Sequence, residues 1–359
     1  MYASTLGVIA SLVLAFAGTL VSGAKMNAPR AAHTATTLND GRVLVAGGFT
    51  EKASAALGAQ LFNPATERYV AAAPMRNLRH SHSATLLANG KVFIVGGYGA
   101  GNATTATAEL FDPVTNTFSA TGSLHTSRAG HVAVMLNTGK VLIAGGVGTN
   151  WSFLASAELY DPATGTFTAT GDMTVARESH VAIRLTDGRV LIAGGHRGRR
   201  ADITLFASAE VYDAATGKFS RTGDMQVRRH KHDAVLLRDG RVVITGGSDE
   251  RDDRGVYNTT EFFDAKSGTF AVGPTMQHGR YKHIGTMLQL PNGAVLLAGG
   301  APQAETYDPR TNAFVTVEGD VRMAGQFSAV AMLSGGRVLI TGGYGNGTGP
   351  RASSWLYRP

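Results

Sequence analysis

The chain has 359 residues, a formal net charge of +7 and 46 glycines, while charged residues make up only 16%. Its many aliphatic and β-branched residues exclude a disordered or fibrous protein. The absence of cysteine excludes disulfides, thiolate metal sites and cysteine nucleophiles, and the basic balance favours anionic partners only through long-range attraction.

The N-terminal segment, residues 1–24, holds an uncharged apolar run from Leu6 to Val21 that ends in small residues. The run is short for a membrane span and is typical of a secretory signal peptide, which predicts a secreted or cell-envelope protein without a membrane span in the mature chain. The alternative is a β-strand, because residues 20–26 align with residues 167–173, the end of an internal repeat. On that interpretation the segment closes the last repeat and the protein is cytoplasmic.

From residue 25 to residue 359 one unit of four short apolar segments recurs, and residues 128–173 show it most clearly. Apolar and β-branched runs between Gly, Asn, Asp and Pro clusters predict a four-stranded antiparallel meander. A Gly-Gly pair marks each copy, and its first glycines are Gly47, Gly96, Gly145, Gly194, Gly246, Gly299 and Gly342. Periods near 50 residues are typical of propeller blades. The sequence therefore predicts a single all-β domain, a seven-bladed β-propeller with blades at roughly 28–75, 76–124, 125–173, 174–225, 226–276, 277–321 and 322–359.

Two kinds of turn join the predicted strands of each blade. Pairs such as Asp40-Gly41 follow the first strand and predict two-residue hairpins with positive φ at both central residues. Motifs such as Asp161-Pro162 follow the third strand, where Asp can form an Asx-turn. The seventh copy ends before a fourth strand, so ring closure is expected to use residues 20–26.

The repeat resembles the kelch repeats of bacterial proteins, whose fold is that of the galactose oxidase propeller. The resemblance rests on the Gly-Gly pair, on the motif Glu-Leu-Tyr-Asp-Pro-x-Thr at residues 158–164 and on the aromatic residue of the fourth strand. The resemblance covers residues 26–359, with Tyr or Phe where the family commonly has Trp in the fourth strand. It implies the fold but no single activity, because kelch propellers include oxidases, sugar epimerases and binding platforms. The copper-radical chemistry of galactose oxidase needs a Cys–Tyr cross-link, so the missing cysteine disfavours it.

The strand directions divide the propeller into two faces. Both kinds of short turn fall on one face, here called the turn face. The loops after Gly-Gly and the links into each first strand fall on the other, the loop face, where we expect binding because these segments vary in length and charge. The candidate binding residues on the loop face are Trp151, Arg197, Arg199, Arg200, Arg228, His230, Asp249 and Asp252. A solvated salt-bridge cluster is the alternative interpretation of the charged ones.

An Arg-x-x-His motif opens the first strand of six copies, and a Glu recurs in the third strand of five. The members are Arg30, Arg79, Arg128, Arg177, Arg229 and Arg280, with His33, His82, His131, His180, His232 and His283, and Glu109, Glu158, Glu210, Glu261 and Glu305. A ring of guanidinium groups at the channel mouth could hold a carboxylate or phosphate. Copy seven lacks all three residue types together, which favours a structural unit in which Arg, His and Glu are hydrogen-bonded to one another.

No catalytic motif, phosphate loop or dinucleotide fingerprint is present. The sequence therefore predicts a binding platform for a protein or glycan, with anionic ligands included, and neither a metal nor another cofactor. Nucleic acid is not expected as a partner, since aromatic residues do not interleave with the basic ones, and a monomer is expected. The alternative is a carbohydrate-active enzyme, epimerase- or lyase-like, that uses Arg and His at the channel mouth.

Overall fold

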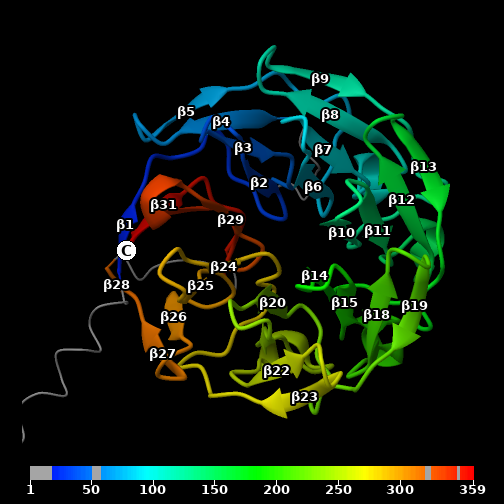
Figure 1. Ribbon diagram of the computed structural model, residues 1–359. Helices are drawn as coiled ribbons and strands as arrows, with labels where there is room; N and C mark the ends of the chain where they lie inside the picture. The colour runs from blue at the N-terminus through cyan, green and yellow to red at the C-terminus, as the bar shows by residue number, and fades with distance from the viewer. Residues whose placement is uncertain (1–17, 51–57, 320–324, 346–347) are drawn as a thin grey trace, which may run out of the picture.

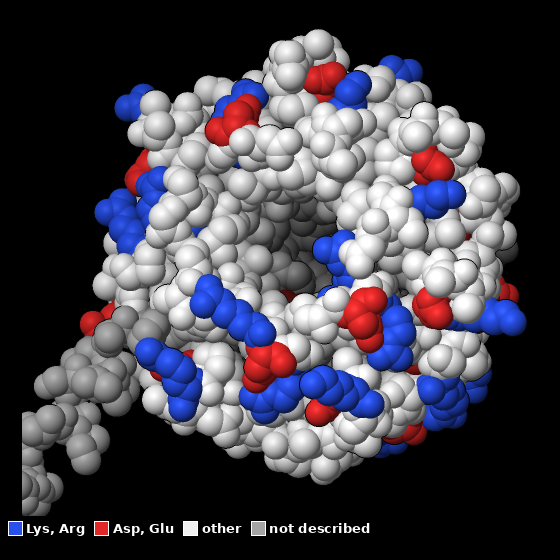
Figure 2. All heavy atoms as spheres, viewed as in Figure 1, with Lys and Arg blue, Asp and Glu red and all other residues white. Residues whose placement is uncertain are grey.

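The computed structural model describes residues 18–50, 58–319, 325–345 and 348–359. Apart from one two-stranded hairpin, their sheets are seven in number and are arranged in a ring (Figure 1). Each of the seven is a blade of four antiparallel strands whose first strand lies nearest the ring axis, and the seventh sheet has one additional short parallel strand. This confirms the predicted all-β, seven-bladed propeller. Seen along the axis, the ring is hollow at its centre, and basic and acidic side chains lie next to one another around it (Figure 2).

The first three blades contain, in order from the axis outward, β2 (Thr34–Thr37), β3 (Val43–Ala46), β4 (Ala59–Asn63) and β5 (Arg68–Ala71); β6 (Ser83–Leu86), β7 (Val92–Val95), β8 (Ala108–Asp112) and β9 (Thr117–Ala120); and β10 (Val132–Met135), β11 (Val141–Ala144), β12 (Ala157–Asp161) and β13 (Thr166–Ala169). The next three contain β14 (Val181–Arg184), β15 (Val190–Ala193), β18 (Ala209–Asp213) and β19 (Lys218–Arg221); β20 (Asp233–Leu236), β21 (Val242–Thr245), β22 (Thr260–Asp264) and β23 (Thr269–Val272); and β24 (Met287–Gln289), β25 (Val295–Leu297), β26 (Glu305–Asp308) and β27 (Ala313–Thr316). The seventh contains β29 (Ala329–Met332), β30 (Val338–Thr341), β31 (Ser354–Arg358) and β1 (Thr19–Ser22).

Several short strands and 3-10 turns lie in the loops between the blade strands. A two-stranded hairpin stands in the loop of blade four, and a two-residue strand pairs parallel with β1; these are β16 (His196–Arg197), β17 (Thr204–Leu205) and β28 (Glu318–Gly319). The 3-10 turns are η2 (Ala100–Asn102), η3 (Thr149–Trp151), η4 (Arg200–Asp202), η5 (Asp252–Arg254) and η6 (Ser334–Gly336). Within the described ranges, no helix has the length and apolar character needed to span a membrane.

The N-terminal strand β1 closes the ring. It pairs antiparallel with β31, so that Leu20 lies opposite Tyr357, and Leu20 is buried in the core of the last blade (Figure 1). Of the two interpretations of residues 1–24, the structure shows the closing strand for residues 19–22. Residues 1–17 lie outside the described part of the chain.

The core lies between neighbouring blades. The second strands are buried along their whole length, for example Val141–Ala144, because each is covered by a blade on both faces. This explains why they read as continuous apolar runs without polar alternation.

Both predicted turn types lie where expected, but the hairpin geometry differs from the prediction. In the first blade Gly41 N–H donates to Leu38 O and Leu38 N–H donates to Arg42 O, which makes a three-residue loop. Only Gly41 has positive φ, as in a type I turn followed by a bulge, so Asp40 needs no left-handed conformation. The Asx-turns are confirmed; Asp161 Oδ1, for example, accepts the Ala163 N–H at 2.9 Å.

The Gly-Gly pairs are the joints between blades. Gly48 N–H donates to the carbonyl of Arg79 in the next blade at 3.0 Å, and the equivalent bond recurs at all seven interfaces. A Cβ at Gly47 would lie only 2.5 Å from that carbonyl. Backbone contact between blades therefore requires glycine at this position.

Candidate functional site

The repeated arginines lie inside the blades. Each of Arg79, Arg128, Arg177, Arg229 and Arg280 has a fully buried side chain and pairs with the Glu of its own third strand at 2.8–3.2 Å. The same guanidinium donates to the first Gly-Gly carbonyl; Arg177 Nη1, for instance, lies 2.7 Å from Gly194 O. The Glu also accepts a backbone N–H from the incoming link, as Glu210 does from Thr174 at 2.7 Å. The Arg–Glu pairs thus brace each blade, and the guanidinium groups do not form the channel wall.

The repeated histidines do not belong to this unit, contrary to the sequence-based hypothesis. Where a ring nitrogen is bonded, its partner lies in the preceding blade; examples are His82 Nε2 with Thr34 Oγ1 at 3.2 Å and His131 Nε2 with Ser83 Oγ at 2.9 Å. Burial, together with a neighbouring Arg, lowers the pKa of His33 and His131 to about 3. These imidazoles are therefore uncharged at neutral pH.

The residue before each of these histidines, or before Ser328 in blade seven, forms the rim of the channel. These seven residues have left-handed φ between 51° and 62°: Ala32, Ser81, Gly130, Ser179, Lys231, Lys282 and Phe327. Backbone hydrogen bonds link neighbours around the rim, as from Ser81 N–H to Ala32 O at 3.0 Å. Left-handed φ is unfavourable for a residue with a Cβ, and its retention by six such residues shows that the surrounding ring dictates this conformation.

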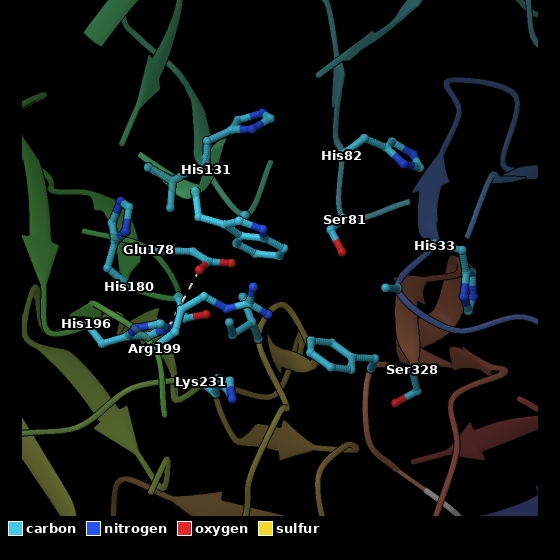
Figure 3. Close-up of a pocket in the computed structure, with 17 residues that line it drawn as sticks. His33, Ser81, His82, His131, Glu178, His180, His196, Arg199, Lys231 and Ser328 are labelled. Atoms are coloured by element: carbon cyan, nitrogen blue, oxygen red, sulfur yellow. Dashed lines mark ion pairs between the residues drawn. The ribbon is translucent and has the colours of Figure 1, made fainter. Parts of the chain in front are cut away.

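A cavity of about 350 Å³ opens inside this rim; we call it the mouth pocket (Figure 3). Hydroxyl groups and the uncharged imidazoles make up most of its polar lining, with Phe327 and Ile284 as apolar members. Apart from the histidines, its ionisable lining residues are Glu178, Arg199 and Lys231. They come from blades four and five and lie on one side of the pocket (Figure 3). The pocket is thus polar overall and charged on one side.

Glu178 is the acidic group of the mouth pocket. Its carboxylate lies over Gly130 of the neighbouring blade, where an added Cβ would approach Glu178 Oε1 to 2.5 Å. The nearest basic side chain is that of His196, whose Nε2 lies 3.7 Å from Glu178 Oε2. Burial lowers the pKa of His196 to about 3, so this imidazole carries no charge at neutral pH. The carboxylate accepts no hydrogen bond from the described residues. Burial raises the pKa of Glu178 to about 7, against the opposing influence of Lys231 and Arg199. A carboxyl group that titrates near neutrality inside a cavity is a candidate functional group.

The two cations differ in how they are held. The Arg199 guanidinium stacks 3.3 Å above the Trp151 ring and forms no ion pair within the described residues. Lys231 Nζ donates to Asp252 at 2.9 Å and to the Tyr281 hydroxyl at 3.1 Å. Although burial opposes it, hydrogen bonds from His230 and Lys231 hold the pKa of Asp252 below its ordinary value. Arg199 is therefore the cation with unused capacity, and Lys231 adds a partly neutralised positive charge.

A second cavity of about 330 Å³, here called the aromatic groove, adjoins the mouth pocket. It is lined by Phe49, His80, Tyr98, Asn102, Trp151 and Arg199, of which the last two also line the mouth pocket. Neighbouring rings are in contact, with centroids 5.1 Å apart for His80 and Tyr98 and 5.8 Å for Tyr98 and Trp151. The two cavities therefore share a wall and could hold two parts of one ligand.

The structure separates the predicted loop-face residues into groups. Trp151 and Arg199 line both cavities, and Asp252 and the buried His230 belong to the network that holds Lys231. Arg228 pairs with Glu250 and Asp249 with Arg251, so these are the exposed ion pairs of the alternative interpretation. Arg197 is an exposed residue of β16 outside both cavities, and the side chain of Arg200 lies outside the described part of the chain.

Sequence reasoning missed Glu178, Lys231 and Lys282, although a signal for them exists. They occupy the two middle positions of the Arg-x-x-His motif, which are uncharged in blades one and three and carry only His80 and Ser81 in blade two. Charge in these positions of blades four to six breaks the symmetry of the ring, and symmetry-breaking is the feature that marks a site in a repeat protein.

Fold and site together define the class of protein, a seven-bladed β-propeller with a cavity at the channel mouth of its loop face. Residues 81–300 match the KLHDC2/KLHL20/DRC7 Kelch-repeats domain, and the chain belongs to the kelch-repeat family. No curated protein matches its sequence.

Solved structures agree on the fold. The chain is similar to a novel fungal alcohol oxidase of the AA5 family in complex with copper, with a TM-score of 0.76 and 15% identity over 96% of this chain and 76% of that one. It is also similar to YjhT, with a TM-score of 0.63 and 13% identity over 82% of this chain and 99% of that one. At these identities the likeness extends to the fold alone.

The residues of this chain do not fit a copper centre of the kind the oxidase fold implies. The sequence has no cysteine, and the described residues contain no group of three or more His, Asp or Glu side chains placed to hold a metal ion.

Proposed function

We propose that this kelch propeller is a binding protein whose loop face takes an acidic saccharide, with the acidic group in the mouth pocket and a sugar ring in the aromatic groove. The observation that carries the proposal is the shared wall of Trp151 and Arg199 between the two cavities. An unpaired guanidinium attracts a carboxylate, and an adjoining aromatic wall suits the apolar face of a sugar ring.

The remaining lining supports the same ligand class. Ser81, Ser179 and Ser328 present hydroxyls, and the imidazoles around them are uncharged, so the pocket offers many neutral hydrogen-bonding groups to a polyol. The volume of about 350 Å³ lies in the range of small-ligand sites. The open cavity supports a small ligand or a single protruding group of a partner.

The rival proposal, an epimerase- or lyase-like enzyme, has less support. Its proton transfers were assigned to histidines of the channel mouth, and burial makes those imidazoles very weak bases. An enzyme of this kind would have to use Glu178, whose pKa is about 7, as its acid or base.

Trp151 provides the assay. It is 43% exposed at the site, whereas the second tryptophan, Trp355, is 4% exposed in the core, so ligand-dependent fluorescence reports on Trp151. The protein is titrated with trigalacturonate and with its methyl ester, which lacks the charges. We expect saturable binding of the acid and at least about tenfold weaker binding of the ester, because a charge-assisted hydrogen bond contributes about 1.5–3 kcal/mol.

The variant Arg199→Gln should weaken trigalacturonate binding by a similar factor, whereas Arg197→Gln, on the same loop but outside the cavities, should not. Equal binding of acid and ester, or equal effects of the two variants, would contradict the proposal. Binding of acidic peptides in place of the sugar would assign the same face to a protein partner.

A further inference from the structure

Glu178 poses a problem for any anionic ligand of the mouth pocket. Its carboxylate lies in the same cavity as Arg199 and Lys231, the two cations that such a ligand would use. The carboxylate occupies space that Gly130 leaves open, and the described residues donate no hydrogen bond to it. A second carboxylate brought into the same confined site raises the pKa of Glu178 further and so favours its protonation.

We propose that the mouth pocket captures its anionic ligand together with one proton, which Glu178 takes up on its carboxylate. This inference rests on the proposed function, because it concerns the same pocket. Protonation removes the competing negative charge, leaves Arg199 and Lys231 to the ligand, and turns Glu178 into a hydrogen-bond donor toward it. No bond other than that of the transferred proton is made or broken.

The histidines that face Glu178 are uncharged in the neutral range. On its own segment lies His180, and on the neighbouring blade His131; burial lowers the pKa of both imidazoles, to about 3 for His131. His196 belongs to β16 in the loop of blade four, and burial likewise lowers its pKa to about 3.

From blade five, Lys231 faces Glu178 and is paired with Asp252, whose pKa is held low. Arg199 acts on Glu178 from the loop of blade four, and burial raises the pKa of Tyr98 on the far side. Burial lowers the pKa of Lys231, against the opposing influence of Asp252. Glu178 is the carboxyl group of this cluster whose pKa lies near neutrality, at about 7.

The sign of the effect follows from linkage. Well below pH 7 Glu178 is already protonated in the free protein, so the affinity for an anion does not change with pH there. Above pH 7 the ligand must bring a proton with it, and affinity falls by up to about tenfold per pH unit until the pKa of the occupied site is reached.

The experiment measures binding of two probes to the full chain from pH 5.5 to pH 9. The first is trigalacturonate, and the second is sulfate, whose charge is constant over this range. Calorimetry at pH 8 in buffers of different ionisation enthalpy gives the number of protons taken up. The variants are Glu178→Gln, which is neutral at every pH, and Glu250→Gln, a control on the exposed rim where Glu250 pairs with Arg228.

We expect the wild type and Glu250→Gln to take up close to one proton per ligand at pH 8 and to bind about tenfold more weakly per pH unit above 7. Glu178→Gln should bind with no proton uptake and with an affinity that is flat up to pH 8. Binding without proton uptake in the wild type, or a pH dependence that survives in Glu178→Gln, would overturn the inference while leaving the proposed function intact. Proton-linked binding of sulfate, without binding of trigalacturonate, would uphold the inference and contradict the proposal that the ligand is an acidic saccharide. Binding of neither probe at any pH would overturn both.

Discussion

The buried Arg177–Glu210 pair offers the sharpest test of the structural role of the repeated arginines. In Arg177→Met the Gly194 and Ser208 carbonyls lose their donor, and Glu210 keeps a fully buried carboxylate without its cation. Removing one partner of a buried pair destabilises by about 3–5 kcal/mol. Arg30→Met is the matched control, because the third strand of blade one carries Gln60 and its arginine has no carboxylate partner there. Loss of bonds to buried carbonyls alone costs about 1–3 kcal/mol, so the two variants should differ by about 2 kcal/mol.

Urea denaturation followed by far-ultraviolet circular dichroism measures this difference as a shift in midpoint at constant slope. The double variant Arg177→Met with Glu210→Gln should be more stable than Arg177→Met alone, since the orphaned charge is gone. The affinity of folded Arg177→Met for trigalacturonate should equal that of the wild type. Unchanged stability together with lost binding would refute the bracing role and return the arginines to the channel mouth as ligand-binding groups.

Three further predictions concern the site, the core and the closing strand. Trp151→Ala should weaken trigalacturonate binding about fivefold to tenfold without lowering Tm, because Trp151 is 43% exposed and its ring mainly contacts the ligand. Since this variant lacks the fluorescent reporter, its affinity is measured by calorimetry. Burial raises the pKa of Asp233 to about 7, so the folded state holds this proton more tightly than the unfolded chain. Its stabilising contribution is therefore full below pH 3.8 and lost as the pH rises through about 7, and the wild type should lose stability relative to Asp233→Asn when denaturation is compared at pH 4 and pH 8. Leu20→Ala should destabilise by about 2–4 kcal/mol in the same urea assay, whereas Val70→Ala on the exposed outer strand should have little effect; equal effects would mean that β1 does not hold the ring closed.

The fold could be predicted from the sequence because each blade repeats the same local signals. Gly41 and its equivalents mark the hairpins, and Asp161 and its equivalents the outer turns, whatever the rest of the chain does. The exact hairpin type could not be predicted, since Asp-Gly suits both a two-residue loop and a three-residue loop with a bulge. The sequence allows two interpretations of the segment that closes the ring, because an apolar run such as residues 19–22 has the same composition in a strand and in a signal peptide.

The site was less predictable, for a physical reason. Trp151 and Arg199 could be singled out because they stand on loops that differ from blade to blade. Glu178 lies inside a motif that recurs around the ring, and its role depends on the space over Gly130, a residue of another blade. The histidines were assigned to the wrong unit because adjacency in the sequence places them beside the arginines, while the first strand turns their rings toward the preceding blade.

A crystal structure of the protein with trigalacturonate at pH 6 tests the proposed binding site most directly. We expect a carboxylate of the sugar at the Arg199 guanidinium in the mouth pocket and an adjoining ring against Trp151 in the aromatic groove. A ligand bound on the turn face, or between blades at the buried arginines, with the mouth pocket empty, would contradict it.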